Sequence, residues 1–228
     1  MSEIFLTIKR AAFFALLITS VAAASPENKP VADLPSLVRD AFQKLVTSVK
    51  WTDFVKNVDD EGEVFNVFGE TDQGGKVSVE VSGKGKLTTV EMDVEANAVP
   101  EAIRKLIGEH MPDFKSEKFS QKFEGDDLTA LDASGCSYEL SGPSSKGKKL
   151  TVEIKADGTF VSIKREVAIS EVPKVVMSAL SAKAPKMKPN YAVEISEQDE
   201  VTAFLLTNRK GRTAYISADG KEVLLHKE

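Results

Sequence analysis

The stretch Leu150–Leu180, LTVEIKADGTFVSIKREVAISEVPKVVMSAL, contains the pattern that decides the predicted fold. Apolar residues alternate on both sides of Asp157-Gly158, which predicts two antiparallel strands joined by a tight two-residue turn. Val172-Pro173 then opens an amphipathic helix, because a proline in the first helical turn lacks only an N–H that would have no partner there. The stretch therefore predicts a β-hairpin followed directly by a helix.

The same two signals recur along the chain, which indicates an internal repeat. Three aliphatic-proline pairs precede runs with apolar residues at helical spacing: Leu34-Pro35, Val99-Pro100 and Val172-Pro173. Three glycines follow alternating segments and close predicted hairpins: Gly85, Gly158 and Gly220. Further strand candidates lie between each helix and its hairpin, so each unit is predicted to contain one helix followed by four antiparallel strands.

We therefore predict an α+β fold built from tandem repeats of one helix packed on a four-stranded antiparallel sheet. The predicted repeats cover residues 34–98, which is the divergent copy, residues 99–171 and residues 172–228.

The N-terminus predicts an export signal. Lys9 and Arg10 precede the apolar run Ala11–Val21, and small residues follow up to Ala24. This is the pattern of a secretory signal peptide, and the run is shorter than the roughly 20 apolar residues of a membrane-spanning helix. We expect a signal peptide over residues 1–24, a linker over 25–33, and a periplasmic or extracellular protein with no membrane span after signal cleavage; an uncleaved N-terminal anchor is the alternative.

Charge and reactive residues exclude several classes of function. The chain has 30 Lys and Arg residues against 35 Asp and Glu residues, a balance that does not favour nucleic acid as a partner. Cys136 is the single cysteine, so an internal disulfide is excluded. The two histidines, His110 and His226, stand in no metal-binding spacing and offer no base for a nucleophile. We predict no catalytic residues, no metal site and no cofactor.

The helix and hairpin signals together resemble the PepSY-like family, whose domains are related in fold to the bacterial β-lactamase-inhibitor protein. The resemblance is carried by Val99-Pro100 with Pro112 and Asp157-Gly158, and by Val172-Pro173 with Pro185 and Asp219-Gly220. It covers residues 98–228 well and residues 34–95 only by periodicity. It implies secreted or periplasmic, non-catalytic modules that bind or inhibit proteins, peptidases among them, and it transfers no binding residues.

Alternation along the hairpins places one set of polar side chains on the face away from the helices, which we expect to be solvated. This solvent-facing sheet surface is the predicted contact for an unknown protein or peptide. Thr151, Glu153, Lys164 and Tyr215 are its candidate binding residues.

Two other classes of function stay open. The chain could instead be a small-ligand or cation-binding envelope protein, using the acidic turns Asp59–Glu61 and Asp126-Asp127 or a pocket between repeats. An uncharacterised hydrolase that relies on carboxylates is the third alternative.

Overall fold

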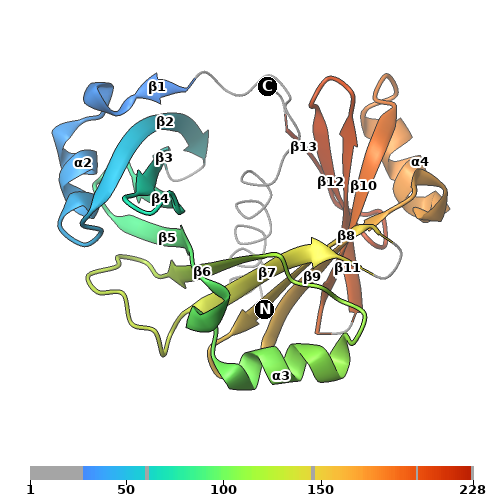
Figure 1. Ribbon diagram of the computed structural model, residues 1–228. Coiled ribbons are helices and arrows are strands. Elements are labelled where there is room, and N and C mark those ends of the chain that lie inside the picture. The colour runs from blue at the N-terminus through green and yellow to red at the C-terminus, as the bar shows by residue number, and fades with distance from the viewer. Residues whose placement is uncertain (1–27, 60–61, 145–146, 199, 227–228) are drawn as a thin grey trace.

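The computed structural model describes residues 28–59, 62–144, 147–198 and 200–226 (Figure 1). The expected signal peptide over residues 1–24 lies outside these ranges. Within them, thirteen strands form one antiparallel sheet in which spatial order equals chain order, from β1 at one edge to β13 at the other. No helix in the described ranges is long and apolar enough to span a membrane.

The secondary-structure elements have the following bounds. The α-helices are α2 (Ser36–Gln43), α3 (Glu101–His110) and α4 (Lys174–Lys183), and short 3-10 turns occupy Val31–Asp33, Ala96–Ala98 and Ile169–Glu171. The strands of the first half are β1 (Lys29–Pro30), β2 (Val49–Asp59), β3 (Gly62–Thr71), β4 (Lys76–Ser82), β5 (Leu87–Asp93) and β6 (Lys118–Glu124). Those of the second half are β7 (Ser137–Pro143), β8 (Lys149–Lys155), β9 (Phe160–Val167), β10 (Pro189–Glu197), β11 (Glu200–Asn208), β12 (Thr213–Ser217) and β13 (Val223–His226).

Each α-helix begins directly after one of the three prolines, as the sequence predicts. Each also buries two apolar residues one turn apart: Val38 and Phe42, Ile103 and Ile107, Val176 and Leu180. Side chains at positions i and i+4 share one face of a helix, so each helix presents a single narrow apolar stripe to the sheet.

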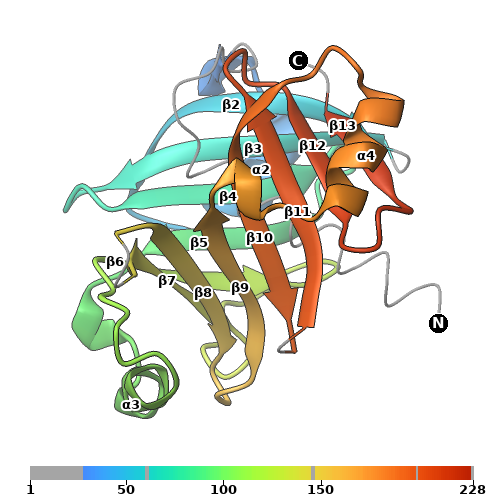
Figure 2. The same cartoon turned by 90° about the vertical axis from the view of Figure 1, so that its right-hand side faces the viewer.

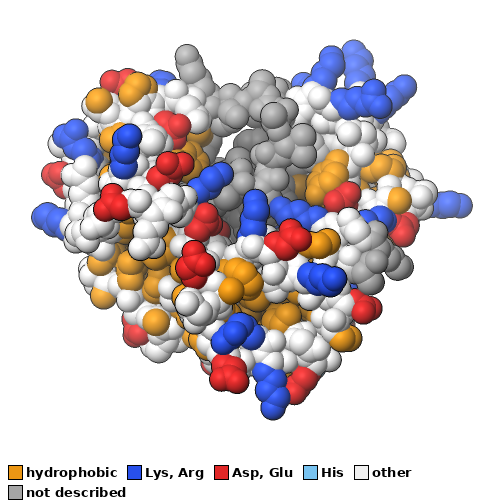
Figure 3. All heavy atoms as spheres, viewed as in Figure 1, with side chains coloured by type: hydrophobic (Ala, Val, Ile, Leu, Met, Phe, Trp, Pro, Cys, Tyr) orange, Lys and Arg blue, Asp and Glu red, His pale blue; other side chains and the backbone are white. Residues whose placement is uncertain are grey.

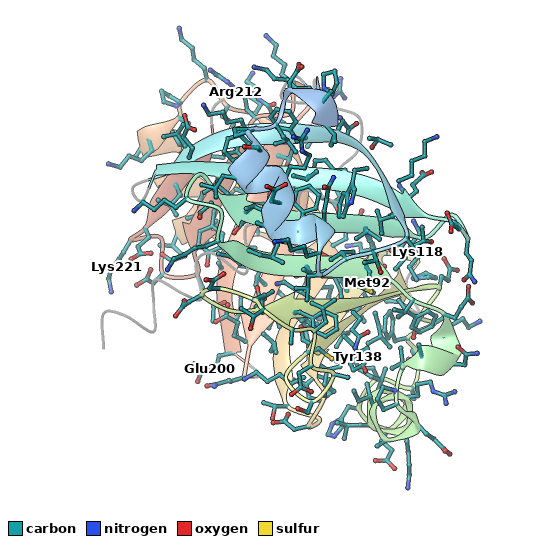
Figure 4. The ribbon with its side chains drawn as sticks, turned by 90° about the vertical axis from the view of Figure 1, so that its left-hand side faces the viewer. Met92, Lys118, Tyr138, Glu200, Arg212 and Lys221 are labelled. Carbon is teal, nitrogen blue, oxygen red and sulfur yellow. The ribbon has the colours of Figure 1, made fainter. Side chains whose placement is uncertain are left out.

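The three α-helices of the described ranges lie on the same side of the sheet, which curves away from them (Figure 1). We call this side the outer face; Figure 4 looks onto it, with α2 in front of the first strands. Its core consists of alternate strand residues such as Val67, Val79 and Val90, all completely buried. A second apolar cluster under α4 includes Phe204 and Ile216.

The predicted architecture of tandem repeats, each a helix on its own four-stranded sheet, is wrong. The sheet continues through both expected boundaries, since β5 pairs with β6, where Val90 lies opposite Phe123, and β9 pairs with β10, where Arg165 lies opposite Glu194. A free strand edge exposes unpaired N–H and C=O groups, and joining neighbouring edges removes that liability. Alternation along one strand shows its two faces but not what pairs with its edges.

Part of the expected linker over residues 25–33 is also ordered in the sheet. Lys29 lies opposite Phe54 and Pro30 opposite Asp53, which makes β1 the edge strand beside β2. Proline is tolerated there because an edge strand need not donate a hydrogen bond on its outer side.

The three predicted hairpin glycines are confirmed as turn residues. Gly85, Gly158 and Gly220 have φ angles of 75°, 89° and 72°, in the left-handed region that favours glycine. The turns also pack against helices, because a Cβ at Gly220 would lie 3.1 Å from the Val175 carbonyl oxygen in α4.

We predict that Gly142→Ala destabilises the protein by about 1–3 kcal/mol, the usual range for overpacking. A Cβ at Gly142 in β7 would lie 1.9 Å from the backbone oxygen of Lys115, so the segment before β6 would have to move. Urea unfolding followed by circular dichroism measures the change.

The matched control is Gly108→Ala in α3, where a Cβ meets nothing within 4 Å. Alanine is the better helix former by about 1 kcal/mol, so this variant should be unchanged or more stable. Equal stability of the Gly142→Ala variant and the natural chain would contradict the close approach of Lys115.

Candidate binding face

The sheet face opposite the helices, here called the inner face, lines the hollow of the curved sheet, and no described helix covers it (Figures 1 and 2). Its side chains are mainly polar and are nevertheless buried. They are Asn66, Ser78, Thr89, Glu91, Ser120, Lys122, Ser137, Ser141, Thr151, Glu153, Ser162 and Lys164. Burying this many polar groups lowers stability unless each group finds a partner.

Cross-strand register shows which of these side chains are neighbours. One row runs across β4, β5, β6 and β7, where Ser78 lies opposite Glu91, Glu91 opposite Lys122, and Lys122 opposite Ser137. A second row places Glu139 opposite Glu153. Small serines alternate with long charged side chains, which leaves the charged groups room to reach across strands.

Lys122 and Glu153 form the centre of a buried ion-pair network. The Lys122 Nζ lies 2.8 Å from Glu124 Oε1 and 3.6 Å from Glu153 Oε1, and the side chains of Lys122 and Glu153 are 2% and 4% exposed. Burial alone would lower the pKa of Lys122, but Glu153 and Glu124 outweigh it and hold that pKa above its ordinary value. Burial alone would raise the pKa of Glu153, but Lys122 and Lys164 outweigh it and hold that pKa low. Both groups therefore stay charged near neutral pH.

A weaker pair joins Lys164 and Glu139, whose Nζ and Oε2 atoms lie 3.7 Å apart. Burial raises the pKa of Glu139 and outweighs the opposing effect of Lys164. The distance exceeds that of a hydrogen bond, so the Lys164 ammonium group is buried without a direct acceptor.

Glu91 differs from the other buried carboxylates because it has no ion-pair partner among the described residues. Its Oε1 accepts a hydrogen bond of 2.9 Å from the Ser120 hydroxyl, and its Oε2 has no hydrogen-bond partner. Burial, and secondarily the charge of Glu139, raise the pKa of Glu91 to about 7. This carboxyl group therefore titrates near neutral pH.

Toward β13 the inner face becomes apolar. Val193 and Ile195 of β10 and Ala203 and Leu205 of β11 are buried together. Tyr215 packs beside them, as does Tyr191, which adds two aromatic rings with polar ends. Burial raises the pKa of the Tyr215 hydroxyl.

The structure gives a mixed outcome for the four candidate binding residues. Thr151, Glu153 and Lys164 lie on the predicted face and are brought together, with Thr151 opposite Lys164. However, they are 7%, 3% and 5% exposed, so the expectation of a solvated surface is wrong for them. The physical reason visible in the described residues is that side chains of neighbouring strands lie against them: Glu153 accepts hydrogen bonds from Ser137 and Ser162 and lies 3.6 Å from Lys122. Tyr215 is half-buried and lies on β12, three strands from Lys164 on β9.

Sequence reasoning missed the apolar end of the inner face and the central place of Glu91 and Lys122. The apolar end has a signal, since Ala203–Leu206 is a continuous apolar run rather than an alternating one. Such a run indicates a strand buried on both faces. Glu91 and Lys122 have no comparable signal, because their partners lie on other strands.

The described residues contain no group of three or more His, Cys, Asp or Glu side chains that could hold a metal ion. Cys136 is buried on the outer side, where its thiol donates a hydrogen bond of 3.1 Å to the Ala133 carbonyl.

A small cavity of about 80 Å³ opens beside the ion-pair network, lined in part by Lys122, Ser137 and Glu153.

No protein-family model matches the chain, and a search of curated proteins finds no matching relative. The resemblance to the PepSY-like family therefore stays a prediction.

We predict that Glu91 makes stability fall as the pH rises through neutrality. A carboxyl whose pKa is raised from 4.5 to about 7 on folding contributes stability that is fully present below pH 4.5 and is lost as the pH passes 7. The loss amounts to about 3.5 kcal/mol, since the pKa rises by about 2.5 and each pKa unit corresponds to roughly 1.4 kcal/mol. The Glu91→Gln variant has no carboxyl that titrates at this position and should not lose this stability. The variant should therefore gain stability relative to the natural chain between about pH 5 and pH 8.

Urea unfolding at several pH values gives this difference directly. The control is Glu109→Gln on α3, whose side chain is 60% exposed and should track the natural chain at every pH. A constant difference between the Glu91→Gln variant and the natural chain would contradict the raised pKa.

We also predict strong coupling between Lys122 and Glu153. Glu153→Leu alone leaves buried positive charge with fewer partners and should cost about 3–5 kcal/mol, and Lys122→Met alone should cost a similar amount. The double variant removes both charges, so its cost should be smaller than the sum of the two by more than about 1 kcal/mol. Urea unfolding of the four proteins measures the coupling, and additive costs would show that the two charges act independently.

Proposed function

We propose that the protein is a secreted or periplasmic, non-catalytic binding module that takes a peptide or protein segment on the inner face of its sheet. The observation that carries this proposal is the group of buried, charged side chains on a face that no described helix covers. A residue set selected for stability alone would be apolar there, because well-packed apolar side chains are often as stable as buried ion pairs or more so. The presence of charged side chains on this face therefore favours a role in recognising a partner.

The layout of the inner face suits a peptide better than a compact small molecule. Charged groups on β5 to β9 adjoin an apolar patch with two tyrosines on β10 to β12. An extended segment lying across the strands would meet polar and apolar zones in turn. Tyrosine is enriched in protein interfaces because it combines a large apolar ring with a hydrogen-bonding hydroxyl.

The export signal expected from the N-terminal sequence supports the location, and the resemblance to PepSY-like modules supports binding or inhibition of proteins as the activity. An inhibitory role toward a peptidase is one form of the proposal. A small-ligand function is the second candidate, and the cavity beside Lys122 and Glu153 is the observation that favours it.

A basic turn between β11 and β12 needs separate treatment in any binding experiment. Arg209, Lys210 and Arg212 are exposed there. Lys and Arg side chains gather at the upper right of Figure 3, and Figure 4 shows Arg212 at the far end of the strands from Glu200. Such a turn attracts acidic molecules without specificity, so it serves as a negative control.

We predict that the purified protein selects peptides from a phage-displayed library of random sequences, and that Tyr215→Ala weakens binding of the selected peptides at least tenfold. Tyr215 contributes a half-buried ring to the apolar end of the inner face, and truncation of such an aromatic anchor commonly costs 2 kcal/mol or more, roughly thirtyfold in affinity. Fluorescence anisotropy of synthetic copies of the peptides measures the affinities.

Two matched variants complete the experiment. Leu37→Ala removes an exposed apolar side chain from α2 on the outer face, and Lys210→Ala removes one charge from the basic turn. Both should leave affinity within about twofold, as expected for residues outside an interface. Selection of no peptide, or loss of binding on Leu37→Ala but not on Tyr215→Ala, would overturn the proposal.

A further inference from the structure

Three oxygen atoms on the inner face are buried without a hydrogen-bond partner: Asn66 Oδ1, Ser78 Oγ and Glu91 Oε2. The three residues are 3%, 4% and 8% exposed. Leaving a buried acceptor unpaired costs about 1–3 kcal/mol, and more for a charged group. Native proteins keep few such groups, so three of them on neighbouring strands call for an explanation.

The sheet brings these residues together from three successive strands. Asn66 lies on β3, Ser78 on β4 and Glu91 on β5. Ser78 and Glu91 are directly opposite in register. Asn66 is two positions along β3 from Phe68, the residue opposite Ser78, so all three side chains project from the same face.

The chemistry of this set selects a positively charged donor. It offers an amide oxygen, a hydroxyl and one carboxylate oxygen, and the other carboxylate oxygen already accepts from Ser120. The two neighbouring cations lie nearer to other carboxylates, since Lys122 Nζ is 2.8 Å from Glu124 Oε1 and Lys164 Nζ is 3.7 Å from Glu139 Oε2. Both attract the Glu91 carboxylate electrostatically, but neither forms an ion pair with it. The negative charge of Glu91 is therefore the one left without an ion pair among the buried charges of the described inner face.

A metal ion fits this set poorly. Ca²⁺ requires about six to eight oxygen ligands and Mg²⁺ a near-ideal octahedron, usually with more than one carboxylate. An alkylammonium or guanidinium group instead supplies several N–H donors at once, and a hydrogen bond to a charged group contributes about 1.5–3 kcal/mol.

We propose that Asn66, Ser78 and Glu91 form a pocket for a cationic nitrogen group, the ammonium of a lysine or the guanidinium of an arginine in a bound peptide. That the cationic group belongs to a bound peptide rests on the proposed function. Binding of a cationic group at these three residues does not. The raised pKa of Glu91 agrees with it, because burial and the charge of Glu139 favour the protonated form and outweigh the opposing effect of Lys122 and Lys164. Binding of a cation reverses that preference and lowers the pKa.

The first test titrates the full chain with n-butylammonium and n-butylguanidinium while ¹³C NMR follows the glutamate side-chain carboxyls. The Glu91 signal is assigned by its loss in the Glu91→Gln variant. We expect the pKa of Glu91 to fall as either cation is added and to stay constant with n-butanol, which has the same chain but no charge. The carboxyl of Glu153, already paired with Lys122, serves as the internal reference and should not move. An unchanged pKa of Glu91, or an equal effect of n-butanol, would refute the pocket.

The second test uses the peptides selected from the random library. We expect each to contain a lysine or arginine whose replacement by alanine lowers affinity at least tenfold for the natural protein and less than twofold for the Glu91→Gln variant. Lysine-to-arginine exchange then separates ammonium from guanidinium recognition. Peptides that bind without any basic residue would leave the binding function intact and overturn this inference. A shift of the Glu91 pKa without any selected peptide would support the pocket and overturn the peptide-binding function instead.

Discussion

The unbroken antiparallel ladder from β1 to β13 is the constraint from which the rest of the structure follows. Each described strand pairs with its neighbours in the chain, so the described sheet has two edges, and α2, α3 and α4 lie on one side of it (Figure 1). The sheet has the twist usual for β-sheets and curves away from these helices (Figure 1). The outer face therefore holds the apolar core, and the inner face becomes a hollow in which polar side chains crowd together.

Burial makes a group of polar strand residues into a candidate site. Lys122, Glu153 and Lys164 would be solvated on a flat sheet, and their mutual attraction would then be small. In the hollow they are nearly inaccessible to water, so their interactions are stronger and an unpaired group is costly. Glu91 illustrates the second effect, because burial and the charge of Glu139 raise its pKa to about 7 despite the opposing effect of Lys122 and Lys164. The proposed peptide function and the proposed cation pocket both use this property.

The candidate site could be predicted only in part. The alternation Thr151-Val152-Glu153-Ile154 assigns Thr151 and Glu153 to the face away from the helices, and the structure agrees on the face. Their burial could not be predicted, because exposure depends on the side chains that other strands place against them, such as Lys122 and Ser137 against Glu153. The neighbourhood of Glu91, with Ser78 on one side and Lys122 on the other, depends on register between strands that are far apart in sequence.

The amino-acid sequence by itself determined the local structure. Proline after an aliphatic residue placed the start of each α-helix, and the Asp-Gly and Lys-Gly turns placed three hairpins, since these signals act through the φ and ψ angles of a few adjacent residues. Only the tertiary structure decided that the strands join into one sheet and that the inner face is a crowded hollow. Backbone N–H and C=O groups are the same in every residue except proline, which lacks the N–H, so the choice of partner strand is not written in any short stretch. It is decided by which arrangement buries the outer core and leaves the fewest strand edges unpaired.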